Sequence, residues 1–233
     1  MSIAMTRDPI FTPPSAWMQA GFLAQVVSLD DPDHRNRVQV KLLAFDAVAQ
    51  QESTMWARVV APFAGSDRGM FSLPDVDDEV FVVFVQGDPR QAVLLGGLWN
   101  GAAAAPADTE AGGVNRYKRI KSKSGITITL DDQQGQETLL LETPGGQKLT
   151  LKDGPGSCTL EDSNGNSIKL EAAGITVQAS AKVKVQASTV EVSAGMVKVD
   201  AALSKFSGMI KCDVLQTNSV ISASYTPGAG NVW

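Results

Sequence analysis

The stretch that decides the fold is ITVQASAKVKVQASTVEVSAGMVKVDA, which runs from Ile175 to Ala201. Four units within it share the pattern apolar–polar–apolar–polar–Ala, and they begin at Ile175, Val183, Val190 and Val197. A short, nearly constant period of this kind is typical of a repeat architecture. The alternation predicts a short β-strand with one apolar face in each unit, and the small residues between the units predict turns.

The same alternation extends upstream, with longer turns rich in Gly and Asn. It occurs at Ile126–Leu130, Leu149–Leu151, Cys158–Leu160 and Ile168–Leu170. Between residues 120 and 224 the only aromatic residue is Phe206. Two cysteines cannot make a disulfide framework, and Cys158, like Cys212, fits the inward register as a small apolar residue.

Short strands of this kind bury only one face, and a single chain with so short a repeat has too little interior to cover its apolar side. Its strand edges would also stay open. Three copies wound around a common axis solve both problems, because apolar residues meet at the centre and neighbouring chains pair the edges. We therefore predict a homotrimeric, intertwined triple-stranded β-helix. Its predicted core residues are Ile126, Ile128, Leu149, Leu151, Ile168, Leu170, Ile175, Val177, Val183, Val185, Val190, Val192, Val197, Val199, Ile210 and Val214.

Two other folds explain the C-terminal half less well. A single-chain β-solenoid usually needs longer coils, often of about twenty residues per turn. A β-sandwich would carry more aromatic residues and less regular spacing.

The N-terminal half has a different chemistry, since ten of the fourteen aromatic residues lie before residue 100. We expect a compact domain there with a mixed aromatic core. Five strands are predicted, at 20–29, 37–43, 56–60, 79–85 and 91–98, with turn-forming residues at 30–36 between the first two. Five short strands in about eighty residues suit a small closed barrel such as the OB-fold.

Several short motifs follow one another in this half. They are Trp56-Ala-Arg58-Val59, Ala64-Gly65, Arg68-Gly69-Met70-Phe71, Leu73-Pro74-Asp75-Val76, Asp78-Glu79-Val80, Gly87-Asp88-Pro89-Arg90 and Leu95-Gly96-Gly97-Leu98-Trp99-Asn100. This order resembles the OB-fold domain of contractile-tail spike proteins, namely the phage baseplate assembly protein V family and the related VgrG proteins of type VI secretion. The family usually carries glycine before Asp-Glu-Val, and here Asp77 stands in that place, so the turn is expected to differ slightly.

From the residues themselves, the motif has structural roles. Gly65 and Gly69 permit unusual backbone angles around a loop, and Gly87-Asp88-Pro89 is a hairpin turn. Trp56 and Trp99 supply large apolar surfaces for a core or a subunit contact.

The whole chain is therefore predicted to be all-β. Its expected parts are an N-terminal arm (1–19), an OB-fold domain (20–100), a linker (101–119), a triple-stranded β-helix spike (120–224) and a tip (225–233). The short basic step RYKR, residues 116–119, is interpreted as a solvated connector. Tyr225, Pro227, Val232 and Trp233 are predicted to form an ordered tip, because three such tails would meet at one point.

The resemblance implies a structural spike of a contractile-tail baseplate that pierces the target envelope when the sheath contracts. It implies a separate trimeric hub protein at the arm and a PAAR-like capping protein at the tip. The expected location is the phage tail baseplate of the virion, after assembly in the host cytoplasm. A spike of a non-viral injection system or type VI secretion apparatus is the first alternative. A polysaccharide-degrading trimeric fibre is a weaker one, because residues 120–224 contain no Tyr for its site.

Composition excludes most catalytic chemistry. The single histidine, His34, lies in a charged turn without a Ser or Cys motif, and no histidine follows it for the iron-binding tip that some family members carry. Asp162-Ser-Asn164-Gly165-Asn166 lacks the remaining ligands of a calcium loop and is interpreted as a tight turn. The carboxylates from Asp75 to Glu79 are interpreted as a solvated loop. We expect no enzyme activity, catalytic residue, cofactor or metal.

Nucleic-acid binding is not expected either. The formal net charge of −5 argues against a general nucleic-acid binder. An OB-fold that binds single strands needs aromatic platforms among basic residues, and basic residues are sparse here.

Overall fold

The computed structural model describes residues 20–45 and 54–223. The chain divides into two units, residues 1–182 and 183–233, which are described separately. Regular structure in the described residues consists of β-strands and two short 3-10 turns, η3 (Leu43–Phe45) and η4 (Val85–Gly87). The predicted all-β fold class is thereby confirmed. Among these residues we find no helix long and apolar enough to cross a membrane.

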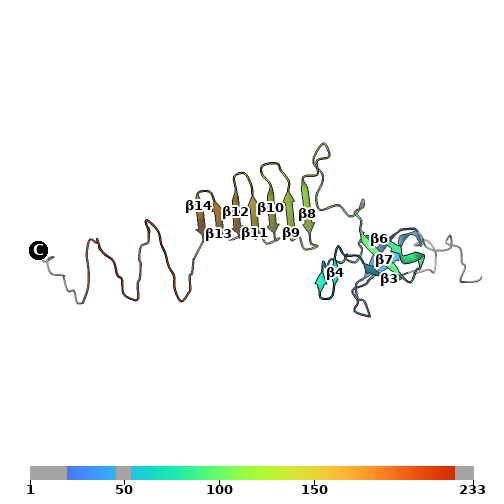
Figure 1. Ribbon diagram of the computed structural model, residues 1–233, viewed down its shortest axis with the longest axis horizontal. Coiled ribbons are helices and arrows are strands. Elements are labelled where there is room, and N and C mark those ends of the chain that lie inside the picture. The colour runs from blue at the N-terminus through green and yellow to red at the C-terminus, as the bar shows by residue number, and fades with distance from the viewer. Residues whose placement is uncertain (1–19, 46–53, 224–233) are drawn as a thin grey trace, which may run out of the picture. The chain divides into compact units, whose positions relative to one another are not determined.

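The first half folds into a closed five-stranded barrel (Figure 1). Its strands are β1 (Phe22–Ser28), β2 (Val38–Leu42), β3 (Thr54–Val59), β6 (Glu79–Phe84) and β7 (Ala92–Gly97), joined in the order β1-β2-β3-β7-β6. The β3–β7 pair is parallel and the other barrel pairs are antiparallel. Two further strands, β4 (Ala64–Gly65) and β5 (Arg68–Gly69), form a small separate hairpin. All five predicted barrel strands are confirmed, each with ends that agree to within two residues.

The barrel core is mostly aliphatic, but it includes Phe84, against which Phe22 packs edge-on, so the expected mixed core is present without a buried tryptophan. Its buried members are Ala24, Val26, Val38, Val40, Leu42, Ala57, Val80, Val82, Phe84, Ala92 and Leu94. Trp99 is 71% exposed, and the half-buried Trp56 lies beneath the Arg37 guanidinium at 5.6 Å. The physical reason is the strand register: Ala57 points into the barrel, so its neighbour Trp56 must point outwards.

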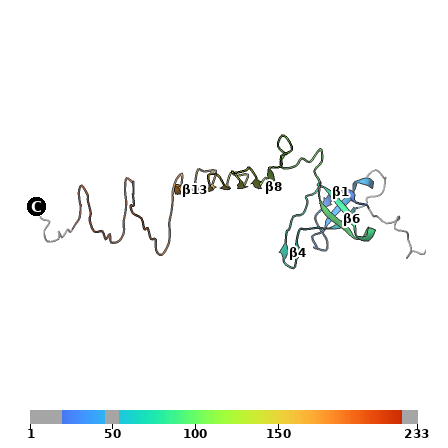
Figure 2. The same cartoon turned by 45° about the horizontal axis from the view of Figure 1, so that its top comes forward.

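The second half of the first unit is a seven-stranded antiparallel sheet in which every strand pairs with its sequence neighbour. The strands are β8 (Tyr117–Lys121), β9 (Thr127–Asp131), β10 (Thr138–Glu142), β11 (Lys148–Lys152), β12 (Ser157–Glu161), β13 (Ser167–Glu171) and β14 (Gly174–Gln178). Figures 1 and 2 show a single layer joined by tight connections. These strands therefore pair within one chain, whereas the sequence prediction had their edges paired by neighbouring chains.

The segment RYKR is part of this sheet and not a solvated connector. Strand β8 begins at Tyr117, and the Arg116 guanidinium forms an ion pair with Asp131 at the end of β9. The alternation that marks the other strands is absent from β8, because Lys118 stands where an apolar residue would be expected.

Beyond β14 the character of the chain changes. From Ala179 to Ala223 no residue is assigned to a strand, although the valine-rich repeat lies in this stretch. Figure 1 shows it as an extended zigzag. Within this single chain its backbone therefore has no sheet partner.

Candidate trimerisation surface

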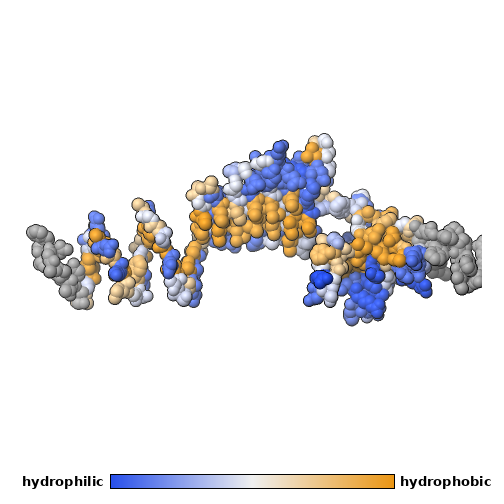
Figure 3. Space-filling view, in the orientation of Figure 1, coloured by the Kyte–Doolittle hydropathy of each residue, from blue (hydrophilic) through white to orange (hydrophobic). Residues whose placement is uncertain are grey.

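One face of the β8–β14 sheet is an apolar surface two side chains wide. Cross-strand pairing brings alternate residues of successive strands into line. One row contains Ile120, Ile128, Leu141, Leu149, Leu160, Ile168 and Val177, and the second contains Leu130, Leu139, Leu151, Cys158, Leu170 and Ile175. We call these two rows the apolar ladder. Figure 3 shows a continuous hydrophobic band over this sheet.

The apolar ladder is open to solvent in the single chain. Ile175 is 71% exposed, Val177 58% and Leu160 51%. The other face of the same strands is mostly polar, with Thr129, Thr150 and Thr159 in one cross-strand line. A contiguous apolar surface of this length on a soluble chain marks an interaction site, because leaving it in water opposes folding.

Seven of the predicted core residues lie on the apolar ladder. They are Ile128, Leu149, Leu151, Ile168, Leu170, Ile175 and Val177. Ile126 precedes β9 and is half exposed in the connection from β8. The predicted core did not include Ile120, Leu130, Leu139, Leu141 and Leu160. The alternation at 126–130 and 158–160 could have added Leu130 and Leu160, whereas Leu139 and Leu141 belong to β10, where three consecutive leucines do not alternate. Burial of these residues in a trimer stays a prediction.

The remaining predicted core residues lie in the second unit, and all are exposed. They are Val183, Val185, Val190, Val192, Val197, Val199, Ile210 and Val214. Neither their side chains nor their backbone groups have a sheet to join within the described part of the chain. Buried peptide groups need hydrogen-bond partners, so burial of this stretch in an assembly would require partners from outside its own chain. The predicted tip, Tyr225, Pro227, Val232 and Trp233, lies outside the described residues.

Several barrel motif residues shape turns. Gly87 is buried with φ of +76°, and the next residue, Asp88, holds the Arg90 guanidinium with an Nη2–Oδ2 distance of 2.8 Å. This hydrogen bonding lowers the pKa of Asp88 to about 2. The hairpin turn predicted at Gly87–Pro89 is therefore confirmed. Pro74 is half-buried and Gly96 lies within β7, so both belong to the scaffold.

Asp77 explains why the resemblance expects glycine before Asp-Glu-Val. Its φ is +78°, which is in the left-handed region where glycine is favoured and where Asp is among the better tolerated residues. Its backbone N–H donates to the carbonyl oxygen of Val26 at 2.9 Å, so the turn is fastened to β1. The substitution thus keeps the conformation in which glycine is favoured.

Two ionic clusters that sequence reasoning missed organise the connections. The nearly buried Asp31 accepts backbone N–H groups of Asp33, Arg35 and Arg37 and the Arg37 guanidinium, which together hold its pKa well below the usual range. Arg116 pairs with Asp131 and reaches Glu110, and its own pKa is raised by the Asp131 hydrogen bonds. Neither cluster has a sequence signature, because its members come together only when the turns form.

The geometry contains nothing suited to group transfer in the described residues. His34 sits at φ +52° in an exposed turn. Asp162 accepts the backbone N–H groups of Asn164 and Asn166 at 2.8 and 2.9 Å, which is the tight turn that was predicted there. No group of three His, Cys, Asp or Glu residues in the described ranges is arranged to hold a metal ion. The arrangement is one of surfaces and stiff strands.

Comparison with known proteins identifies both halves. Residues 22–99 match the type VI secretion system/phage-baseplate injector OB domain. Residues 138–202 match the phage baseplate V C-terminal trimerisation domain, and the two matches together cover more than half of the chain. The chain belongs to the baseplate V and VgrG family of spike proteins. The resemblance seen in the barrel motifs is thereby confirmed.

Curated relatives of this spike family match part of the chain at moderate identity. The type VI secretion system spike protein VgrG1c of Pseudomonas aeruginosa is 25% identical over 111 residues, which is 45% of this chain and 15% of the relative. VgrG3 of Vibrio cholerae is 31% identical over 96 residues, 40% of this chain and 9% of the relative. The actin cross-linking toxin VgrG1 of Vibrio cholerae is 28% identical over 94 residues, which is 39% of this chain and 9% of the relative. The chain thus spans less than a sixth of the length of these relatives.

Proposed function

We propose that this spike-family chain is the homotrimeric central spike of a contractile-tail baseplate, which pierces the target envelope when the sheath contracts. The observation that carries the proposal is the apolar ladder, open to solvent in one chain, within a region that matches a trimerisation domain. Three ladders facing one axis would remove all three from water at once. A threefold arrangement is the smallest closed one in which each sheet faces two others.

The shaft would have two parts with different backbone pairing. In residues 117–178 each chain supplies one hydrogen-bonded wall, because its strands pair with their own neighbours. In residues 183–223 the walls would be shared, because the extended chain has no pairing of its own and requires strands from the two other copies. Walls in which every peptide group is paired around a packed core resist bending, which a piercing device needs.

The partners follow from the family resemblance. The arm, residues 1–19, would fasten the spike to a separate trimeric hub protein, and the tip, residues 225–233, would receive a PAAR-like cap. Residues 101–116 would link the barrel to the shaft, because the last three residues of the linker expected from the sequence, 117–119, belong to β8. The proposed function of the barrel and the shaft is mechanical and non-enzymatic. The virion tail is the proposed place.

A spike of a type VI secretion apparatus is the second candidate, because the curated relatives are named as spike proteins of that system. The two candidates differ in where the chain is found. A tail spike co-purifies with free contractile particles, whereas an apparatus spike stays with the producing cell or is released without a sheathed particle.

The test replaces adjacent residues of β11 in the organism that encodes the chain. Leu149 lies on the apolar ladder and Thr150 on the opposite face of the same strand. With Leu149→Asp we expect contractile particles or secretion to lose their effect on target cells, and with Thr150→Asp we expect both to remain. Full activity of the Leu149→Asp strain would contradict the proposal.

A further inference from the structure

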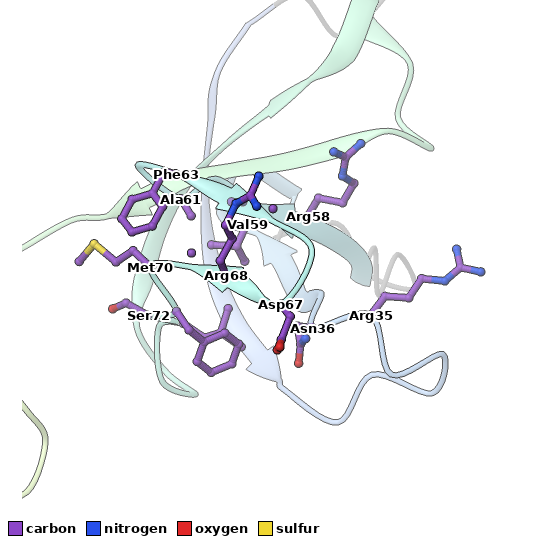
Figure 4. Close-up of a pocket in the computed structure, with 15 residues that line it drawn as sticks. Arg35, Asn36, Arg58, Val59, Ala61, Phe63, Asp67, Arg68, Met70 and Ser72 are labelled. Atoms are coloured by element: carbon purple, nitrogen blue, oxygen red, sulfur yellow. The ribbon is translucent and has the colours of Figure 1, made fainter.

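A hollow of about 710 Å³ opens on the barrel surface between β3 and the β4–β5 hairpin. Three arginines lie along it: Arg35 from the turn before β2, Arg58 from β3 and Arg68 from β5. The one carboxylate in its lining is Asp67. Figure 4 shows the Arg58 and Arg68 side chains extending in the same direction, with Arg35 at the rim.

These three arginines differ from others in the chain because none has a carboxylate partner in the described residues. Arg37 pairs with Asp31, Arg90 with Asp88 and Arg116 with Asp131. The side chains of Arg35, Arg58 and Arg68 are instead exposed, and no hydrogen bond or ion pair from residues 20–45 or 54–223 engages their guanidinium groups. The chain as a whole is acidic, so this local excess of positive charge is not a general property of it.

The same hollow carries apolar side chains that the barrel core does not use. Phe71 is 74% exposed, Phe63 63% and Met70 46%. All three belong to the segment that forms the β4–β5 hairpin and the residues flanking it. Cations beside exposed rings and a flexible thioether form a typical protein-binding surface, because aromatic residues, Met and Arg are enriched in interfaces and Met adapts its shape to a partner.

The β4–β5 hairpin holds this surface in place through its two glycines. A Cβ at Gly65 would lie 2.8 Å from Nε of Arg68, so glycine allows the guanidinium to lie against the backbone. Gly69 has φ of +151°, and a Cβ there would lie 2.9 Å from the carbonyl oxygen of Phe63. The hairpin therefore leaves room for the Arg68 side chain to lie beside Gly65.

We propose that this arginine hollow binds an acidic peptide segment of another protein, with carboxylates on Arg58 and Arg68 and an apolar side chain against Phe63 and Met70. Arginine forks suit carboxylates because they donate two parallel hydrogen bonds. A nucleic-acid strand fits less well, since it needs a positive groove that follows its backbone over several nucleotides, and the three arginines surround a single hollow. All the residues concerned belong to one barrel, so the proposal does not depend on trimerisation.

The test selects binders from a random twelve-residue peptide library on the full-length chain. Arg58→Gln/Arg68→Gln serves for counter-selection, and circular dichroism verifies that this variant is folded. We expect the enriched peptides to carry three or more Asp or Glu residues beside an aromatic or aliphatic one. Synthetic copies should bind about tenfold more weakly to Arg68→Gln alone, because one charge-assisted contact is lost.

Arg90→Gln is the matched control, because it removes an exposed arginine of the same barrel that lies outside the hollow. It should leave peptide affinity within about twofold of wild type. Enriched peptides without an excess of acidic residues, or equal weakening by Arg90→Gln and Arg68→Gln, would overturn the proposal. So would a fifteen-nucleotide single strand that binds more tightly than the peptides at physiological salt and is released by the same Arg68→Gln change.

Discussion

Replacing Val192 by aspartate should prevent three chains from associating. Val192 is 72% exposed in the single chain and belongs to the valine-rich repeat that is predicted to face the trimer axis. Full burial of a valine side chain contributes about 1.5–3 kcal/mol, so this position would supply about 1–2 kcal/mol from each chain. An aspartate would forfeit that gain in all three chains.

The charge adds a larger penalty. Three carboxylates would meet at the axis without a cation, and burying each unpaired ion costs several kcal/mol. The total is on the order of 10 kcal/mol per trimer, which corresponds to roughly seven orders of magnitude in the association constant. A movement of one side chain cannot relieve the repulsion, because threefold symmetry places all three carboxylates at the same position along the trimer axis.

The assay is the mass of the purified chain in solution, by light scattering and by sedimentation at micromolar concentration. Wild type should have three times the 24.6 kDa mass of one chain. Val192→Asp should sediment as a smaller or aggregated species. Ser193→Asp is the control, because a residue one position along a strand faces the other side. Normal trimers from Val192→Asp, or loss of trimers in Ser193→Asp alone, would show that the inward register is wrong.

Three further outcomes test separate parts of the chain. Asp77→Val should destabilise the barrel by about 1–2 kcal/mol because a β-branched residue resists φ of +78°, whereas Asp77→Gly should be nearly neutral. Thermal melting compares the two variants, and equal melting points would refute the account of this turn. In a Cys212→Ser background, a maleimide should label Cys158 slowly in the native protein and rapidly in denaturant, because the trimer would bury this thiol among the three ladders. Equally fast labelling in both states would argue against three ladders around one axis. The hydrogen bonds from Asn166 and Asn164 lower the pKa of Asp162 to about 2, below its ordinary 3.8. The ionised Asp162 therefore stabilises the folded chain above pH 3.8, and this stabilisation is lost as the pH falls towards 2. Asp162→Asn should remove this pH dependence in acid titrations of the melting temperature, and an unchanged acid profile would contradict it.

At the arginine hollow, residues of the barrel motifs lie on the protein surface and not in the hydrophobic core. Read as sequence, Arg58 and the Arg68–Phe71 segment looked like parts of a scaffold. In the folded barrel these side chains project outwards, and the core that stabilises the domain consists mainly of valine, leucine and alanine from other positions. Where a hairpin interrupts a strand, the spacing of residues in the sequence does not predict whether a side chain points into the barrel or towards solvent.

For the shaft, period-two alternation was enough to predict β9, β11, β12, β13 and β14 and their apolar face, but not β10, whose three consecutive leucines do not alternate. It places Leu149 and Leu151 on one side and Thr150 on the other whatever the surroundings, because successive side chains of a strand point in opposite directions. The same local rule predicted the barrel strands. Positions that depend on a turn, such as Asp31 with Arg37 or Arg116 with Asp131, could not be found this way, because distant groups meet there only after folding.

Which backbone pairs with which was decided by the tertiary structure alone. Alternation specifies the face of a strand but not the strand that accepts its hydrogen bonds, since every peptide group carries the same donor and acceptor. The fold gives β8–β14 partners within their own chain and leaves residues 179–223 without a strand partner. Alternation does not reveal that division, because the apolar–polar pattern continues on both sides of Gln178, although the longer turns rich in Gly and Asn occur only upstream of it.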